Sequence, residues 1–437
     1  MLVGALALTL TLGLSAPVYS AETTTVQPVA AKAKKKKKHR RGGKVRAAWP
    51  RSKKAKAPKN QLARWLAKQV GPAPRKKKRS RRALASDSTT ALSSAGGGKL
   101  WLIRSFEIPT SDSASNRLAN YSWTYDNALA TFAFIGVGLR SGAEQLLDQL
   151  QALQRTDGSL EFAFDTKSGD AAPYYRTGAL AWVGMAAAAY RRTYDNDRYD
   201  KLIGGVIKYL LSLRNSDGLI RGGPDVGWVS TQHNLLAAGF LRDIADQMTS
   251  SKTLGGYSRS QLTTIHTTLS NAIVAKLLVV DSPTLAHFKQ GVDDPQIPID
   301  VQALGAMFLK LRGDARATSV ANTIQAQFPV ASRRVSGSSS YVSGYKPFTG
   351  TGVPDVIWSE GTIEAAVALD RLNITSPTAT AAVTSIYATS IGSTTGPIGA
   401  DREAVSPVWG EYHTWPTSAA ASWLLIAADG GDLLLTR

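Results

Sequence analysis

Six short alanine-rich segments recur along the chain, and this recurrence limits the possible folds more than any other feature. The segments begin at Thr124, Thr177, Thr231, Ile299, Ser359 and Trp415, so their starts are 53, 54, 68, 60 and 56 residues apart. Each has a polar or acidic residue at or near its start, and loops containing Trp or Tyr precede most of them. A period of this length with two helices per unit indicates a helical-hairpin repeat.

Longer amphipathic helices are predicted between these segments. In 143–153 and 202–213 the apolar residues recur with the 3.6-residue period of a helix face. Similar patterns cover 259–279, 315–328 and 377–388. The first two helices are followed by Asp157-Gly158 and Asp217-Gly218, and Asp-Gly is a turn signal because Gly tolerates a positive φ.

Six such units predict an all-α fold, an (α/α)6 toroid of six helical hairpins over residues 99–437. The small Ala and Gly residues suit inner helices that are crowded by their neighbours, whereas the outer helices present Leu and Ile inward and charge outward. An open solenoid of helix pairs is the structural alternative.

The positive charge is concentrated near the N-terminal end. Residues 32–82 contain 24 of the 52 Lys and Arg and no acidic residue, whereas residues from 83 onward contain 28 basic and 31 acidic side chains. The net charge of +20 therefore indicates nothing about the ligand of the globular part, and no specific nucleic acid is expected. Residues 22–98 are predicted to be a disordered basic tail, in which the amphipathic stretch 61–70 could fold against a surface.

The first 21 residues read as a signal peptide, because an uncharged apolar run over 2–14 precedes the small residues at 18–21. A secreted or cell-surface-associated bacterial protein is therefore expected. The basic tail then has an anionic cell-wall polymer or a membrane surface as its expected partner, or is a soluble spacer. The chain has no Cys, which excludes disulfides, thiolate metal sites and a cysteine nucleophile.

The loops before the repeated segments combine aromatic rings with acids. If the inner helices are parallel, their N-termini open onto one face, and these loops converge there. Flat rings stack on sugar rings, and carboxyl groups bind hydroxyls and catalyse glycoside cleavage, so the combination predicts a carbohydrate site. Asp126 and Glu360 also stand where helix caps and first-turn acids belong, but capping does not explain the tryptophans.

Four motifs carry a resemblance to a known superfamily. TYDNALATFAFI, GGPDVGWVSTQHN, WSEGTIEAAVAL and GEYHTWPTSAAASWLL resemble bacterial secreted proteins of the six-hairpin glycosidase type, over roughly residues 100–435. The resemblance implies an (α/α)6 fold with catalytic carboxylates at Asp126, Asp225, Glu360 and Glu411. Gln232 departs from the pattern, because many relatives have Glu at the corresponding position.

We therefore expect a secreted glycoside hydrolase that cleaves or binds an oligo- or polysaccharide as a monomer, without a metal or cofactor. Glu360 or Glu411 is the expected general acid, because Trp358 and Trp409 beside them could desolvate the carboxyl group. Asp126 or Asp225 is the expected base. The predicted substrate-binding residues are Trp123, Tyr125, Trp228, His233, Asp300, Trp358, Trp409, Tyr412, His413 and Trp415.

Two other functions compete with this prediction. In a polysaccharide lyase, proton abstraction beside a uronate would fall to residues among His233, Asn234, Tyr412 and His413, with Arg221 or Arg402 neutralising the uronate. In a noncatalytic wall-associated protein, the cavity would only hold a glycan. An unsaturated product would identify the lyase, and binding without new reducing ends would identify the binding protein.

Overall fold

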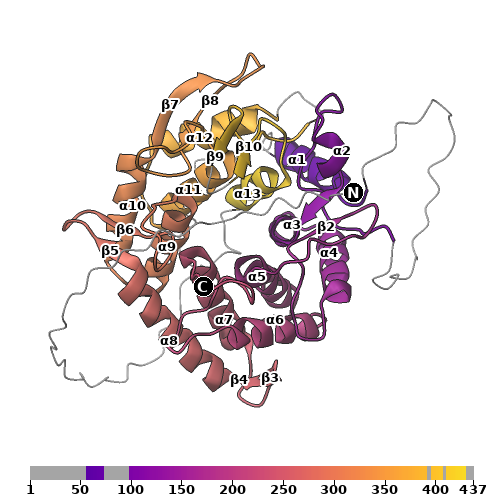
Figure 1. Ribbon diagram of the computed structural model, residues 1–437, viewed down its shortest axis with the longest axis vertical. Coiled ribbons are helices and arrows are strands. Elements are labelled where there is room, and N and C mark those ends of the chain that lie inside the picture. Colours follow the sequence, from indigo (N-terminus) through magenta and orange to yellow (C-terminus); the bar gives the residue numbers. More distant parts are fainter. Residues whose placement is uncertain (1–55, 73–97, 391–394, 407–409, 430–437) are drawn as a thin grey trace.

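The computed structural model describes residues 56–72, 98–390, 395–406 and 410–429, and six of its helices form a closed inner ring (Figure 1). Each inner helix packs against the next, and the last packs against the first. The six are α3 (Thr124–Gly136), α5 (Thr177–Tyr194), α7 (Thr231–Gln247), α9 (Ile299–Leu311), α11 (Ser359–Arg371) and α13 (Ser418–Ala428). The closure confirms the predicted (α/α)6 toroid and excludes the open solenoid.

An outer layer of helices surrounds this ring (Figure 1). Five of them follow an inner helix in the sequence, as the periodicity predicts. They are α4 (Arg140–Leu153), α6 (Asp200–Ser212), α8 (Arg259–Leu277), α10 (Arg316–Gln327) and α12 (Pro377–Ala388). Most of their Leu and Ile side chains are buried, so the apolar stripe of each outer helix covers the inner helices.

The sixth outer position is occupied by α1 (Lys56–Lys68), which packs against α13 and α3. Trp65 and Leu66 are buried in the common core, and the Trp65 indole donates a hydrogen bond of 2.8 Å to Glu107. The prediction of disorder over 22–98 is therefore wrong for residues 56–72, and the toroid does not begin at residue 99. The physical reason is the apolar face of the 61–70 stretch, which covers α13. The signal-peptide prediction and the remainder of the basic tail lie outside the described residues.

Short strands and one short helix lie in the loops. Within the described ranges the strands form five short antiparallel pairs, which decorate an all-α architecture. The pairs are β1 (Tyr121–Trp123) with β2 (Ala163–Asp165), β3 (Thr253–Leu254) with β4 (Tyr257–Ser258), β5 (Leu278–Val280) with β6 (Ala286–Phe288), β7 (Pro329–Arg334) with β8 (Tyr341–Tyr345), and β9 (Ala404–Ser406) with β10 (Gly410–Tyr412). The short helix is α2 (Ser115–Leu118), and no described helix is long and apolar enough to cross a membrane.

Small residues in the inner ring are required by close packing. A Cβ atom on Gly184 of α5 would lie 2.8 Å from the Phe240 ring of α7. Such a distance is shorter than van der Waals contact, so Ala and Gly let the inner helices approach each other. The two predicted Asp-Gly turns are also present, because Gly158 and Gly218 have φ angles of 92° and 91°.

A repeated hydrogen bond fixes the orientation of the inner helices. The first backbone N–H of each inner helix donates to a carbonyl in the loop that leads to the next inner helix. The pairs are Thr124 to Phe162, Thr177 to Gly222, Thr231 to Gln290, Ile299 to Pro347, Ser359 to Gly399 and Ser418 to Ser105. The last pair closes the circle, so all six helix N-termini and their loops are held on one face of the ring.

Buried polar side chains at the fourth position of four inner helices reinforce this arrangement. Asn234 accepts a hydrogen bond from the Ile220 N–H at 2.8 Å and donates to the Ile220 carbonyl at 2.9 Å. Gln302 does the same with Phe288, at 2.7 and 2.8 Å. The equivalent residues Asn127 and Thr362 accept hydrogen bonds from Ile103 and Tyr345.

Candidate active site

Three acids come from the first turns of inner helices on the N-terminal face, and two of them act electrostatically on the third. Asp126 and Asp300 have exposed fractions of only 2% and 7%, and the carboxyl groups of both raise the pKa of Glu360. We call Asp126, Asp300 and Glu360 the acid cluster. They come from α3, α9 and α11, so only closure of the ring brings them together.

Glu360 has the environment of a protonated acid. Burial raises its pKa to about 8, the hydrogen bond from Tyr125 opposes this rise, and the charges of Asp126 and Asp300 add to it. The Tyr125 hydroxyl donates to Oε1 of Glu360 and accepts a hydrogen bond of 3.1 Å from the Trp423 indole. This chain of donors fixes the orientation of the carboxyl group.

The other two acids have lower pKa values. Burial raises the pKa of Asp300 to about 6, while backbone N–H groups at the start of α9 oppose the rise. The Gln232 amide also donates a 2.7 Å hydrogen bond to Oδ2 of Asp300. Burial raises the pKa of Asp126 to about 7, and the Ser105 hydroxyl opposes it. At neutral pH, Asp300 is therefore the most ionised of the three acids.

Two further groups belong to this environment. Glu364 lies one turn after Glu360 on α11 and is almost completely buried. Its burial, together with the charges of Asp300 and Glu360, raises its pKa well above the ordinary value. Burial and the same two acids raise the pKa of Tyr412, whose ring lies 6.5 Å from the Trp358 ring. The sequence interpretation missed Glu364, although its spacing of four residues from Glu360 was a usable signal.

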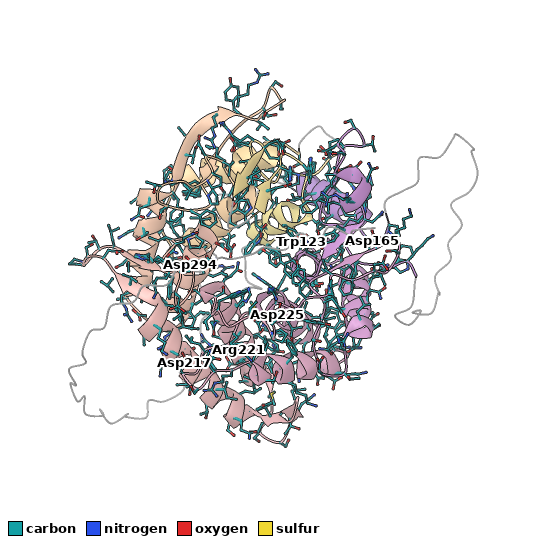
Figure 2. All side chains as sticks on the ribbon, in the orientation of Figure 1. Trp123, Asp165, Asp217, Arg221, Asp225 and Asp294 are labelled. Atoms are coloured by element: carbon teal, nitrogen blue, oxygen red, sulfur yellow. The ribbon has the colours of Figure 1, made fainter. Side chains whose placement is uncertain are left out.

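A second group of predicted residues gathers around Arg176, not in the acid cluster. Arg176 forms a 2.9 Å ion pair with Asp225, and its guanidinium lies 5.7 Å from the Trp228 ring centre. The side chains of Asp225 and Trp228 are 51% and 39% exposed. Figure 2 places Asp225 nearer to the centre of the ring than Asp217 of the second Asp-Gly turn.

His233 lies beside this group and is fixed in a neutral form. Its Nδ1 atom is 2.9 Å from the Thr177 hydroxyl, and its ring centre is 5.5 Å from that of Trp228. Burial and then the charge of Arg176 lower the pKa of His233 to about 3. The position suits a hydrogen-bonding role.

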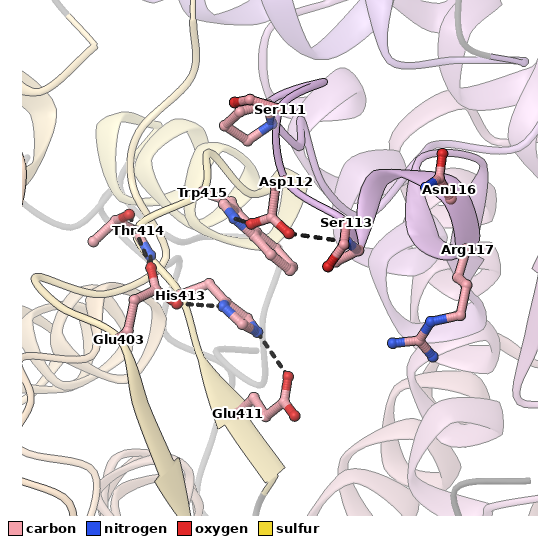
Figure 3. A pocket seen from close by; sticks show the side chains of 12 residues that line it. Ser111, Asp112, Ser113, Asn116, Arg117, Glu403, Glu411, His413, Thr414 and Trp415 are labelled. Atoms are coloured by element: carbon pink, nitrogen blue, oxygen red, sulfur yellow. Dashed lines mark hydrogen bonds and ion pairs between the residues drawn. The ribbon is translucent and has the colours of Figure 1, made fainter. Parts of the chain in front are cut away.

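Three more of the predicted residues line a separate pocket between the loop 109–117 and the β9–β10 hairpin (Figure 3). We call it the Trp415 pocket. Its volume is about 870 Å³, and Glu411, His413 and Trp415 lie in its wall. His413 hydrogen-bonds both Glu403 and Glu411, the latter at 3.1 Å. The expected desolvation of Glu411 does not hold, because its side chain is 58% exposed. Trp409 lies outside the described residues.

The residues considered for a lyase are not gathered in one place. Asn234 is fully buried and holds the Ile220 backbone, so it cannot reach a substrate. Arg402 is paired with Asp401 at 2.9 Å. His233 and His413 belong to the two different groups described above. The geometry therefore gives no support to the lyase.

The sequence interpretation missed other residues at this face, because they lie outside the repeated motifs. Phe106 lies 5.2 Å from the Trp123 ring and 5.9 Å from the Trp415 ring. Asp112 accepts a 3.1 Å hydrogen bond from the Trp415 indole. Both residues precede the first repeat, so spacing gave no indication of their position. The described residues contain no group of three or more His, Asp or Glu placed to hold a metal ion.

The fold, an (α/α)6 toroid, is shared by solved structures of glycosidases. A wild-type glycosidase structure is similar over 88% of this chain and 99% of its own, with a TM-score of 0.58 and 13% identity. A glycosidase variant in complex with glucose has a TM-score of 0.57 at 13% identity, with the same coverage.

An enzyme described as a novel alpha-amylase from Clostridium perfringens covers 87% of this chain and 99% of its own, with a TM-score of 0.56 and 9% identity. At these identities the likeness concerns the fold. No family model and no curated protein matches the sequence.

Proposed function

We propose that the chain is a glycoside hydrolase that acts on an oligo- or polysaccharide at the acid cluster. The observation that carries this proposal is the environment of Glu360, a largely desolvated carboxyl group with a pKa of about 8, whose neighbour Asp300 has a pKa of about 6. Glycoside hydrolysis needs such a pair, one carboxyl group protonated and one ionised. The similar folds of glycosidases, one of them bound to glucose, support the same substrate class.

In this mechanism Glu360 is the general acid. It is protonated at neutral pH and gives its proton to the glycosidic oxygen as the bond to the anomeric carbon breaks. Asp300 is the partner base and takes a proton from the water that attacks the anomeric carbon. Tyr125 holds the Glu360 carboxyl group, and the Gln232 amide favours the ionised form of Asp300.

Aromatic rings around the cluster supply a sugar-binding surface. Trp358 directly precedes α11, and its ring meets that of Tyr412 edge to face. Trp228, in the group around Arg176, offers a further exposed ring. Asp126 remains in the proposal as the acid that keeps the Glu360 proton in place through its charge.

The test is turnover of a panel of bacterial, plant and storage glycans, measured as released reducing ends. Glu360→Gln and Asp300→Asn are each expected to lower kcat by about 10²–10⁴-fold, the usual contribution of a positioned acid or base. Asp225→Asn is the matched control and is expected to change kcat only slightly, because Asp225 is paired with Arg176 and does not contribute to the pKa shift of Glu360.

Three outcomes would count against the proposal. Unchanged turnover in both cluster variants would remove the assigned roles. Ultraviolet absorbance from an unsaturated product would replace hydrolysis with elimination. Binding of a glycan by the wild-type protein without new reducing ends would make the chain a noncatalytic binding protein.

We also propose that the protein is exported and that its basic N-terminal segment binds an anionic cell-wall polymer or membrane surface, with the toroid acting as a monomer. The support comes from the sequence: an apolar leader-like run precedes 24 basic residues that have no acidic neighbour over 32–82. The tail would then keep the proposed enzyme near a polyanionic surface.

A further inference from the structure

The Trp415 pocket is not used by the proposed reaction, yet it lies directly beside the acid cluster. Glu411 and Tyr412 are consecutive residues of β10, so their side chains point to opposite faces of the strand. Tyr412 is on the side of Trp358 and the charges of Asp300 and Glu360, whereas Glu411 lines the pocket. One strand therefore separates the two sites.

Some side chains of the pocket are held in place by hydrogen bonds to one another and to the backbone. Both oxygens of Glu403 are occupied, one by His413 and the other by the N–H and hydroxyl of Thr414 at 2.9 and 3.0 Å. Asp112 likewise accepts hydrogen bonds from the Ala114 N–H and the Trp415 indole. These groups fix the His413 ring against the Trp415 ring, with the ring centres 3.6 Å apart and the planes 4° from parallel.

Other groups are free to meet a ligand. In the described part of the chain, the side chains of Asn116 and Arg117 make no hydrogen bond or ion pair, and Glu411 uses only Oε2, toward His413 (Figure 3). A carboxylate acceptor, a guanidinium donor and an amide suit neighbouring sugar hydroxyls. Three acids, Asp112, Glu403 and Glu411, face the single arginine of the wall, so the pocket disfavours an anionic sugar and suits a neutral one.

An aromatic path connects this pocket with the acid cluster on a second side. The Trp415 ring contacts Phe106, and Phe106 contacts Trp123 edge to face. Trp123 immediately precedes α3, whose first turn carries Asp126. Phe106 and Trp123 are both partly exposed, so their rings offer stacking surface between the two sites.

We propose that the Trp415 pocket binds neutral sugar units of the same substrate chain, away from the bond that is cleaved, so that the substrate is an extended oligo- or polysaccharide. This inference rests on the proposed function. A volume of about 870 Å³ is within the range of drug-sized ligand sites and accommodates more than a single sugar ring.

The experiment compares the wild-type protein with the double variant Arg117→Ala/Glu411→Ala on malto- and cello-oligosaccharides, from the disaccharide to longer oligomers. Both hydrolysis and binding by titration calorimetry are measured. In the wild type, kcat/KM is expected to rise with chain length. In the double variant, it is expected to fall about tenfold for the longest oligomers and to stay unchanged for the shortest. Lys208→Ala on α6 is the surface control.

Two results of the hydrolysis assay overturn the inference, and the binding measurement separates its failure from that of the proposed function. Equal losses on short and long oligomers would place Glu411 or Arg117 in the catalytic machinery. A wild-type rate independent of chain length would show that the pocket holds no sugar of the substrate. If no oligomer is hydrolysed but the wild type binds long ones more tightly than the double variant does, the proposed hydrolysis fails and the sugar pocket stands. If no oligomer is hydrolysed or bound, both fail.

Discussion

Burial gives Glu360 and Asp300 different proton affinities, although both are carboxylic acids in the first turns of neighbouring inner helices. Glu360 is hydrogen-bonded by a phenol and faces two other acids, whereas Asp300 is held by an amide and by backbone N–H groups. The pKa of Glu360 is therefore higher than that of Asp300, because the ordinary pKa of Glu exceeds that of Asp and because burial and these neighbours act differently on the two groups. The activity and the free energy of unfolding should therefore both depend on pH, and single substitutions at these positions can measure each dependence separately.

Glu360→Gln is expected to make folding less sensitive to alkaline pH. The pKa of Glu360 is raised from 4.5 to about 8 in the fold, so the folded state holds this proton more tightly than the unfolded state. The group's contribution to the free energy of unfolding is full below pH 4.5 and is lost as the pH rises toward 8. The neutral amide avoids this loss, so the variant should be more stable at pH 8 by roughly 1–4 kcal/mol. Urea denaturation at several pH values measures this, and parallel curves for both proteins would refute it.

Gln232→Glu is expected to shift the pH dependence of activity. The rate should rise as Asp300 ionises near pH 6 and fall as Glu360 loses its proton near pH 8. A carboxyl group at position 232 replaces the amide donor by a like charge, which raises the pKa of Asp300 by about one unit or more. The acid limb of kcat/KM should then move upward. Gln232→Leu removes the donor without adding charge, so an equal shift in both variants would show that repulsion is not the cause.

Among the secondary-structure elements, α1 and the loops before the inner helices stabilise the ring although they are short. The helix α1 completes the outer layer from a distant part of the sequence, and its apolar face joins the common core. The loops are held by backbone hydrogen bonds and by the buried polar side chain at the fourth helix position.

Leu66→Ala is expected to lower the free energy of unfolding by about 2–5 kcal/mol, because it removes a fully buried side chain between α1 and the ring. The measurement is chemical denaturation followed by tryptophan fluorescence. Arg64→Ala, on the exposed side of the same helix, is the control and should change stability by less than about 0.5 kcal/mol. Equal effects would mean that α1 is not packed on the ring in solution.

Asn234→Leu keeps the side-chain size but leaves both polar groups of the Ile220 backbone without a partner. A cost of roughly 2–4 kcal/mol is expected, because two buried groups lose their hydrogen bonds. Asn271→Ala, at an exposed position of α8, should cost far less. The folded fraction of Asn234→Leu should retain its turnover, and a complete loss of turnover in stable protein would instead indicate a direct role in catalysis.

At the scale of the whole molecule, the charge is divided between a basic N-terminal segment and a slightly acidic remainder. The full chain is expected to bind an immobilised sulfated polysaccharide and to elute with rising salt. A variant lacking residues 1–55, which keeps α1, should elute at lower salt because fewer counterions are released on binding. Elution of both proteins at the same salt concentration would show that the deleted segment does not bind the polyanion.

Much of the architecture could be predicted because helical periodicity is a local property. All six inner helices and the five outer helices that follow them agree with the expected ranges to within a few residues. The site was less predictable. Asp126, Asp300 and Glu360 lie at the expected helix starts, and the first two raise the pKa of the third, but Asp225 pairs with Arg176 and Glu411 lines another pocket. Each loop's path depends on contacts with segments far away in the sequence.

The sequence by itself determined the repeat, the choice of small residues for the inner ring, and the collection of acids and aromatic rings at the helix starts, because these follow from spacing and residue type along the chain. Only the tertiary structure decided which acids share an environment, that Glu360 keeps its proton, and that a helix from the basic segment completes the outer layer. Burial and ring closure set these properties, and both arise from contacts between residues that are hundreds of positions apart.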